Sequence, residues 1–192
     1  MQNVVIRAIE RLDFRTKEAY KTLRTNLSFA GKNVKVISLT SCTPNEGKTS
    51  VSFQLCLSLA ESGKQTILVD ADLRKSVLRG RYKANREKYG LSHYLSGQVE
   101  LDDACCRTNV NNFDIIFAGP VPPNPSELLG GDAFRNMLEV LRMKYDYVIV
   151  DTPPLGSVID AAIVGAICDG TVIVVESGAI SYKFVQNVKE QL

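Results

Sequence analysis

The sequence lacks the features that mark membrane-spanning, nucleic-acid-binding and metal-thiolate proteins. None of its apolar runs approaches the roughly 18 residues that a membrane-spanning helix needs, and no signal peptide opens it. Its 23 basic and 21 acidic residues nearly balance, whereas a nucleic-acid-binding chain usually has a lopsided basic count. Its five cysteines show no metal-ligand spacing. We therefore expect a cytoplasmic protein with reduced thiols and no nucleic-acid partner.

What is present is enough apolar material for one sizeable core, since 45% of the 192 residues are hydrophobic. Short apolar runs alternate with segments of helical periodicity, a pattern typical of an α/β protein with a doubly wound, mostly parallel sheet flanked by helices. We expect an N-terminal helical segment over 1–33 and a nucleotide-binding domain over 34–192. The expected strands cover 34–40, 67–69, 112–118, 145–151 and 170–176.

A strand–loop–helix unit between Val34 and Gly63 organises the chain. Its loop ends in Gly47-Lys48-Thr49, the terminal half of a phosphate-binding loop. In such a loop, backbone N–H groups cradle phosphates at the start of the helix. The lysine neutralises the phosphates, and the threonine hydroxyl binds Mg²⁺. The match is imperfect, because the full motif has a glycine where Cys42 stands.

Aspartates follow two of the apolar strands. Asp70 and Asp72 come after Ile67-Leu-Val69, and Asp151 ends Val148-Ile-Val150 in a Walker B pattern. Ligands of open α/β sheets bind at the carboxyl ends of the strands, which favours metal binding or proton transfer. If the strand continued, Asp70 and Asp72 would face the same side. Each aspartate ending a strand could instead cap the turn that follows.

Two charged stretches permit more than one interpretation. Glu18, Lys21 and Arg24 recur every three residues on an expected helix over 15–30, and spacing alone favours a solvated face with internal ion pairs. A basic stretch follows the second strand, for which a solvated surface is favoured over substrate docking. Its residues are Lys75, Arg79, Arg81, Lys83, Arg86 and Lys88.

Together these motifs resemble the bacterial tyrosine kinases of capsule and exopolysaccharide synthesis. The segment Ser41-Cys-Thr-Pro-Asn-Glu-Gly-Lys-Thr49 matches their loop Ser-x-x-Pro-x-Glu-Gly-Lys-Ser/Thr, which has no glycine at the position of Cys42. Asp70-Ala-Asp72-Leu-Arg74 matches their extra motif Asp-x-Asp-x-Arg, and Val148-Ile-Val-Asp151 is similar to their Walker B strand. The resemblance begins near Glu18 and covers nearly all the remaining chain.

The resemblance implies an ATP-dependent protein-tyrosine kinase, autophosphorylating in trans, with a fold related to partition and division-site ATPases. Thr49, Asp70 and Asp151 would hold Mg²⁺, and Asp72 would accept the proton of the tyrosine hydroxyl. The implied catalytic residues are Lys48, Asp70, Asp72 and Asp151. The implied nucleotide-binding residues are Pro44, Asn45, Glu46, Gly47, Lys48, Thr49, Ser50 and Arg74.

The family also implies partners. Its members form rings through a Glu-x-x-Arg-x-x-Arg helix, which here reads Glu18, Lys21 and Arg24, with lysine in place of the first arginine. A membrane-embedded activator, here a separate polypeptide, would hold the kinase at the inner face of the membrane, and the substrates would be protein tyrosines. We expect the family's final strand and tyrosine-rich tail to be missing after Leu192.

Two other functions remain open from the sequence. One is an ATPase switch of the partition type, whose members typically carry a lysine early in the loop, where Thr43 stands here. The other is a nucleotide-binding regulatory scaffold of the polysaccharide machinery, without kinase activity. A substitution that removes the Asp72 carboxylate would distinguish the kinase from the scaffold. A kinase would lose tyrosine phosphorylation, whereas a scaffold would still bind its partners and assemble.

Overall fold

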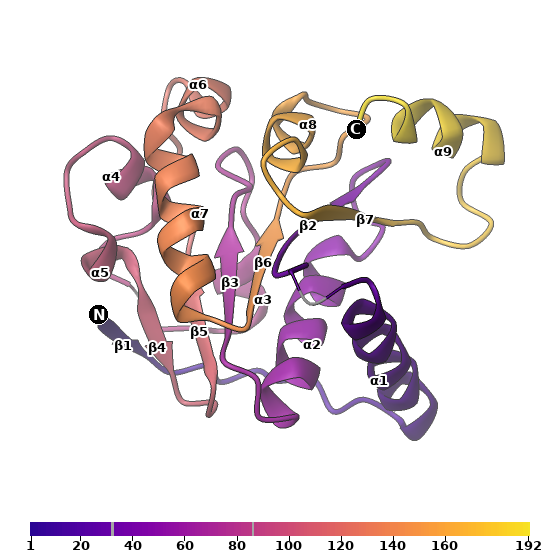
Figure 1. The fold of residues 1–192 in the computed structure, drawn as a ribbon, viewed down its shortest axis with the longest axis horizontal. Coiled ribbons are helices and arrows are strands. Elements are labelled where there is room, and N and C mark those ends of the chain that lie inside the picture. The colour runs from indigo at the N-terminus through magenta and orange to yellow at the C-terminus, as the bar shows by residue number, and fades with distance from the viewer. Residues whose placement is uncertain (32, 86) are drawn as a thin grey trace.

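The computed structural model describes residues 1–31, 33–85 and 87–192 as a layered α/β domain. Its sheet has seven strands in the order β1-β4-β5-β3-β6-β2-β7, and every neighbouring pair is parallel except β4 with β5 (Figure 1). The strands are β1 (Gln2–Val4), β2 (Val36–Ser41), β3 (Thr66–Asp70), β4 (Cys106–Thr108), β5 (Phe113–Ile116), β6 (Tyr147–Asp151) and β7 (Gly170–Val174).

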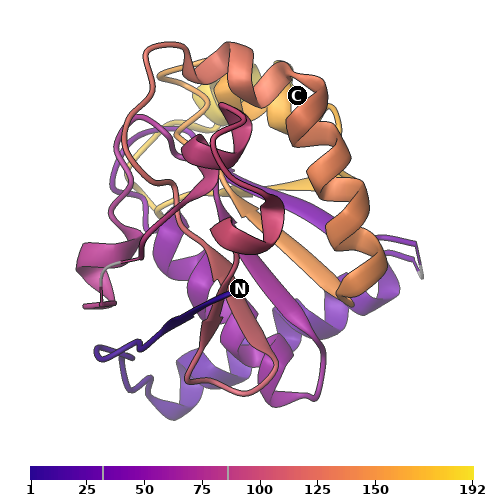
Figure 2. The ribbon, with the colours of Figure 1, turned by 90° about the vertical axis from the view of Figure 1, so that its left-hand side faces the viewer.

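Nine helices accompany the sheet in the described residues. The longest are α1 (Phe14–Phe29), α2 (Lys48–Glu61) and α7 (Asp132–Lys144). The shorter ones are α3 (Leu78–Arg81), α4 (Leu91–Leu95), α5 (Leu101–Ala104), α6 (Pro125–Gly130), α8 (Asp160–Gly165) and α9 (Tyr182–Lys189). Figure 2 shows the sheet between α1 and α2 on one side and α7 on the other. The predicted doubly wound α/β fold is confirmed.

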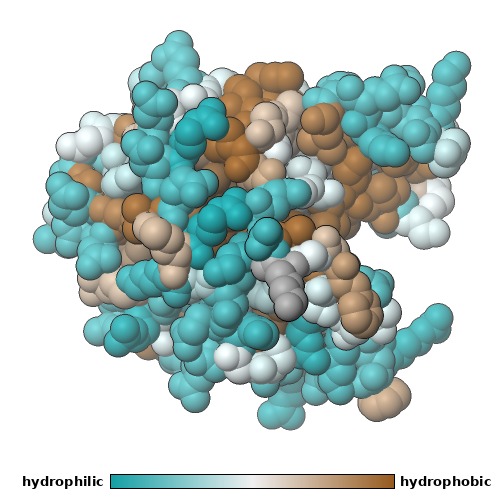
Figure 3. Space-filling view, in the orientation of Figure 1, coloured by the Kyte–Doolittle hydropathy of each residue, from teal (hydrophilic) through white to brown (hydrophobic). Residues whose placement is uncertain are grey.

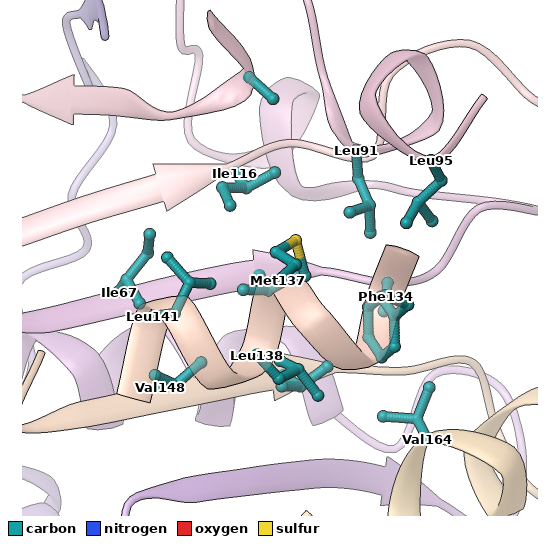
Figure 4. Close-up of a cluster of buried hydrophobic side chains, with 14 of the residues drawn as sticks. Ile67, Leu91, Leu95, Ile116, Phe134, Met137, Leu138, Leu141, Val148 and Val164 are labelled. Carbon is teal, nitrogen blue, oxygen red and sulfur yellow. The ribbon is translucent and has the colours of Figure 1, made fainter. Parts of the chain in front are cut away.

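The central strands are apolar throughout because side chains of both their faces are buried. In β3, Ile67 and Val69 enter one hydrophobic cluster and Leu68 enters the other. The first cluster packs under α7, where Phe134, Met137 and Leu141 meet the sheet (Figure 4). The second packs under α2, and α1 covers α2 from outside through Tyr20, Leu23 and Leu27.

The N-terminal prediction is wrong for residues before Asp13, which caps α1 by accepting a hydrogen bond from the N–H of Thr16. The segment before it includes β1, a strand that pairs with β4 at the far edge of the sheet. Both strands have only three residues, too few to show a period of two. The extended residue Gly131 separates α6 from α7.

The strand β7 forms the opposite edge of the sheet, and its residues are only half-buried. Apolar surface gathers beneath α9 and beside β7 (Figure 3). It includes the exposed side chains of Val175 and Phe184. None of the helices in the described part of the chain combines the length and apolar character that crossing a bilayer requires.

Two methionines of α7 test the assignment of its buried face. Met137 is fully buried under the sheet, and Met143 is 80% exposed on the same helix. We expect Met137→Ala to lower the free energy of unfolding by about 2–5 kcal/mol, because it removes buried surface and leaves a cavity. We expect Met143→Ala to change it by less than about 0.5 kcal/mol. Urea denaturation of both variants measures the difference, and equal losses would contradict the assignment.

Candidate active site

The predicted phosphate-binding loop lies between β2 and α2 and has the backbone that phosphate binding needs. Asn45 and Gly47 have positive φ angles of 71° and 86°, which bend the chain into the start of α2. No side chain caps that helix, so its first N–H groups remain available to an anion. Lys48 and Thr49 are both buried at this point. The loop therefore offers backbone donors and a lysine to phosphate oxygens.

Neighbouring loops hold the phosphate-binding loop in place. The carboxylate of Glu46 accepts hydrogen bonds from the N–H of Thr43 at 2.6 Å and from the N–H of Glu176, beyond β7, at 3.4 Å. The segment after β6 packs against the other side. A Cβ added at Gly156 would lie 2.2 Å from the carbonyl oxygen of Cys42. Glycine at 156 is therefore required by the close approach of two backbones.

Asp70 and Asp151 end adjacent strands and stand directly opposite each other in the register of β3 and β6. Each follows a valine of the cluster under α7, so alternation turns both carboxylates toward α2. Both side chains are almost completely buried. The sheet therefore brings two carboxylates together beside the phosphate-binding loop, as predicted from the positions of the two motifs.

One carboxylate is paired with the loop lysine. The Nζ of Lys48 lies 3.0 Å from Oδ1 of Asp151, and the hydroxyl of Ser52 donates to the same oxygen at 2.9 Å. The Nζ of Lys48 also lies 3.3 Å from the Oγ1 of Thr49. This pair offsets one buried negative charge, and removing the lysine would leave that charge uncompensated.

The other carboxylate, that of Asp70, forms no ion pair with the residues that the structure describes. Asp70 accepts a short hydrogen bond from the hydroxyl of Ser76. Burial, and next the charge of Asp151, raise the pKa of Asp70 to about 7. Oδ1 of Asp70 and Oδ2 of Asp151 are both buried without a hydrogen-bond partner among the described residues.

These two unpaired oxygens fit a divalent cation. Mg²⁺ prefers oxygen ligands and usually takes one or two from carboxylates, with others from phosphates and water. Thr49, Asp70 and Asp151 supply a hydroxyl and two carboxylates beside the loop. In the described residues no three His, Cys, Asp or Glu side chains form a metal site by themselves. The fit is therefore that of a cation shared with a bound nucleotide.

Asp72 and Arg74 lie beyond the end of β3, which stops at Asp70, so the predicted strand alternation does not extend to Asp72. Asp72 is partly exposed, and its Oδ1 accepts a hydrogen bond from the N–H of Lys75 at 2.9 Å. It therefore closes the turn itself, the role that sequence reasoning considered for Asp70, and it keeps a second oxygen.

Arg74 pairs with Asp160, at the start of α8, rather than with Asp70 or Asp72. Its Nε lies 2.7 Å from Oδ2 of Asp160 and its Nη2 lies 3.0 Å from Oδ1. Ser126 donates to the same carboxylate at 2.6 Å. Burial raises the pKa of Asp160, but the bonds from Arg74 and Ser126 outweigh it, and the pKa lies below its usual value. A role for Arg74 in nucleotide binding stays a prediction.

The three predicted interface residues make contacts within the chain. Lys21 lies 2.7 Å from the carboxylate of Glu18 on α1, the internal ion pair that spacing alone favoured. Arg24 donates to the carbonyl oxygen of Ser58 on α2 at 2.6 Å. Glu18 and Lys21 are about half exposed. Ring formation through this helix stays a prediction.

Sequence reasoning missed four polar residues of the site. Ser52 follows Lys48 by one helical turn, which could have indicated that both side chains face Asp151. Ser76, Ser126 and Asp160 come from loops and helix ends distant in sequence, and no local pattern points to them. Of the basic stretch, Arg86 lies outside the described residues.

Comparison with known proteins identifies the family. The family described as the AAA domain matches residues 34–192. The tyrosine-protein kinase CpsD of Streptococcus agalactiae is 44% identical over 178 residues, which cover 93% of this chain and 78% of CpsD. The chain belongs to the bacterial tyrosine kinases. The kinase domain of the Escherichia coli tyrosine kinase Etk superposes on it with a TM-score of 0.87 and 36% identity, covering 96% of this chain and 76% of that one.

A bacterial tyrosine kinase is thus built on the fold of a different kind of ATPase. The cell division ATPase MinD of Pyrococcus furiosus superposes with a TM-score of 0.61 and 25% identity over 73% of this chain and 59% of its own. The family and the P-loop fold imply nucleotide binding with Mg²⁺.

The contact between Gly156 and Cys42 predicts a stability effect. We expect Gly156→Ala to lower the free energy of unfolding by about 1–3 kcal/mol, because the new methyl group displaces the backbone of the loop. The same displacement should weaken nucleotide binding. Gly170→Ala is the matched control, since no atom lies within 4 Å of its added Cβ. Thermal unfolding and nucleotide titration test both, and unchanged affinity in Gly156→Ala would show that the loop tolerates the shift.

The raised pKa of Asp70 predicts how stability depends on pH. Because the native state binds this proton more tightly than the unfolded chain, the contribution of Asp70 is fully present below about pH 4 and lost as the pH rises to about 7. We expect Asp70→Asn to be more stable than the parent at pH 8 without nucleotide, and this gain to vanish near pH 4. Denaturation across this range measures it. Asp72→Asn should show no such gain.

Proposed function

We propose that this chain transfers the γ-phosphoryl group of ATP to tyrosine hydroxyl groups of proteins. The observation that carries the proposal is that Asp70 and Asp151 stand opposite each other, that Lys48 pairs with Asp151, and that each carboxylate has one buried oxygen without a hydrogen-bond partner among the described residues. Phosphoryl transfer requires positioning and charge neutralisation more than covalent participation by the protein. The site supplies both within one short stretch of the sheet edge.

The loop binds and orients the phosphates. The N–H groups at the start of α2 and the ammonium of Lys48 neutralise their charge, and the backbone from Pro44 to Ser50 encloses them. Thr49, Asp70 and Asp151 would hold Mg²⁺, which would supply positive charge to stabilise the charge that develops on the phosphate oxygens. Asp70 would hold the cation as an unprotonated carboxylate.

Asp72 acts as the base for the tyrosine hydroxyl. It lies on the turn immediately after the metal-binding strand, is reached by solvent and keeps one oxygen outside its hydrogen bond to Lys75. A carboxylate positioned beside the tyrosine hydroxyl can take the phenolic proton as the new P–O bond forms. The bidentate pair between Arg74 and Asp160 fixes the far end of this turn.

The cellular setting follows from the resemblance to kinases of capsule and exopolysaccharide synthesis. The chain would act in that pathway at the inner face of the membrane, held by a separate membrane-embedded activator. Rings would form through Glu18, Lys21 and Arg24, and neighbouring copies would phosphorylate each other. The half-exposed ion pair between Glu18 and Lys21 is available for exchange to a neighbour's charges.

The decisive test is tyrosine phosphorylation with and without the Asp72 carboxylate. We expect the parent protein, given ATP, Mg²⁺ and the cytoplasmic segment of its activator, to phosphorylate a tyrosine-rich acceptor peptide. We expect Asp72→Asn to lower kcat by about 10²–10⁴-fold, the usual contribution of a general base, and to leave nucleotide affinity unchanged. Intact mass and phosphotyrosine detection report the transfer, and nucleotide titration reports the binding.

Lys48→Met should lose both transfer and nucleotide affinity, and its thermal unfolding must be checked because it leaves Asp151 without its cation. If the parent hydrolysed ATP without forming phosphotyrosine on any acceptor, the chain would be an ATPase switch instead. A full rate in Asp72→Asn would remove that residue from the proton transfer.

A further inference from the structure

A large cavity lies near Asp70, because Ser76, which donates to that carboxylate, is one of its lining residues. Its volume is about 860 Å³, large enough for several amino-acid side chains. One wall comes from α3 and the residues before it, and the other from Gly90, His93 and the segment Phe117–Pro120. Figure 2 shows the segment with α3 at the left-hand edge of the molecule, from which the chain turns back toward α4.

The cavity borders the reaction site through two hydrogen bonds. Ser76 lines it and donates to the carboxylate of Asp70. Arg81 also lines it, and its Nη1 donates to the hydroxyl of Ser50 at 2.5 Å, on the first turn after the phosphate-binding loop. A peptide in the cavity would therefore extend directly from a tyrosine placed at Asp70 and Asp72.

The lining carries an excess of positive charge. Arg79, Arg81 and Lys88 contribute three cations against the single carboxylate of Glu87. That carboxylate is a weak partner, since its Oε2 lies 3.9 Å from Nε of Arg79. The ammonium of Lys88 lies 5.0 Å from the ring centre of Tyr89, so it projects over an aromatic wall. The cations therefore keep donors for an anionic ligand, and Tyr89 offers an apolar surface beside them.

The far wall is rigidly built. Leu91 donates its N–H to the carbonyl oxygen of Phe117 at 2.7 Å, and Ser92 donates to that of Ala118 at 2.9 Å. A Cβ at Gly90 would lie 2.6 Å from the backbone nitrogen of Gly119, so the two segments touch without side chains between them. The cavity is thus a preformed feature of the fold.

We propose that this cavity binds the segment flanking the acceptor tyrosine and selects flanks that carry negative charge. The inference rests on the proposed kinase function, which it deepens by naming the class of acceptor. The anionic groups are carboxylates of Asp or Glu, or the phosphate of a tyrosine already modified two or three residues away. Arg79 and Lys88 bind these groups at the rim, while the acceptor ring reaches Asp72. The basic stretch that sequence reasoning assigned to solvent would be a docking surface.

Direct binding tests this without requiring phosphoryl transfer. Fluorescein-labelled peptides with one tyrosine are titrated with the Mg-ADP-bound protein, and fluorescence anisotropy gives Kd. One peptide has glutamates on both flanks, its twin has glutamines, and a third has glutamines with one phosphotyrosine. We expect the glutamate peptide to bind at least about tenfold more tightly than the glutamine twin at low salt, an advantage that falls as salt rises. The phosphotyrosine peptide shows which anion is preferred.

Charge removal locates the site. Lys88→Gln combined with Arg79→Gln should abolish most of the affinity advantage of the anionic peptides. The Kd of the glutamine peptide should stay within about twofold of its value for the parent protein. Lys83→Gln is the matched control, an exposed lysine of the same basic stretch that does not line the cavity, and it should bind as the parent does. If the double variant proves unstable, Lys88→Glu alone should abolish most of the preference, because it leaves Arg79 and Arg81 against two carboxylates in the lining.

Equal affinity for the glutamate and glutamine peptides, or an advantage that survives the double variant, would overturn the inference. Anionic peptides that bind as expected, in a protein that forms no phosphotyrosine, would count against the kinase and leave the cavity's ligand class standing. Phosphorylation of acidic and neutral acceptors at equal kcat/KM would leave the kinase standing and remove the cavity from substrate selection.

Discussion

Two buried aspartates end adjacent parallel strands, only Asp151 is paired with a lysine among the described residues, and much of this molecule follows from that arrangement. Lys48 neutralises Asp151, but no described cation neutralises Asp70, which therefore holds its proton up to about pH 7. Burying a second carboxylate beside the first is unfavourable for folding. A divalent cation held by these carboxylates, as proposed, would offset that cost, because a ligand that binds only the native state stabilises it.

The rest of the fold serves to hold these groups at one place. Two hydrophobic clusters pack on the two faces of the sheet. Because successive side chains of a strand alternate between these faces, the carboxylates of Asp70 and Asp151 point toward α2. The backbone contact of Gly156 with Cys42 supports the phosphate-binding loop from behind. The pair between Arg74 and Asp160 anchors the turn that carries Asp72 to α8. Rigid placement of this kind is what phosphoryl transfer needs from a protein.

The fold and the candidate site were predictable wherever a motif lies on a buried strand or on the loop that follows it. The strands around Leu68 and Ile149 are recognisable as continuous apolar runs, and the glycine and lysine of the phosphate-binding loop have a fixed spacing. Prediction failed where the signal was short or non-local. The strands β1 and β4 have three residues each, too few for a periodic pattern. Arg74 meets Asp160 across 86 positions of the chain, a pairing that no local rule supplies.

By itself, the sequence determined the fold class, the family and the candidate groups for binding nucleotide and metal, because these depend on local patterns and fixed spacings. Tertiary structure decided which other residues those groups contact. It paired Asp151 with Lys48, left Asp70 with no cation among the described residues, made Asp72 the residue that closes its own turn and formed a basic cavity near them. The contacts and the burial of a side chain depend on segments that meet only after folding. Contacts and burial in turn determine the pKa and the charge of the ionisable groups in the site.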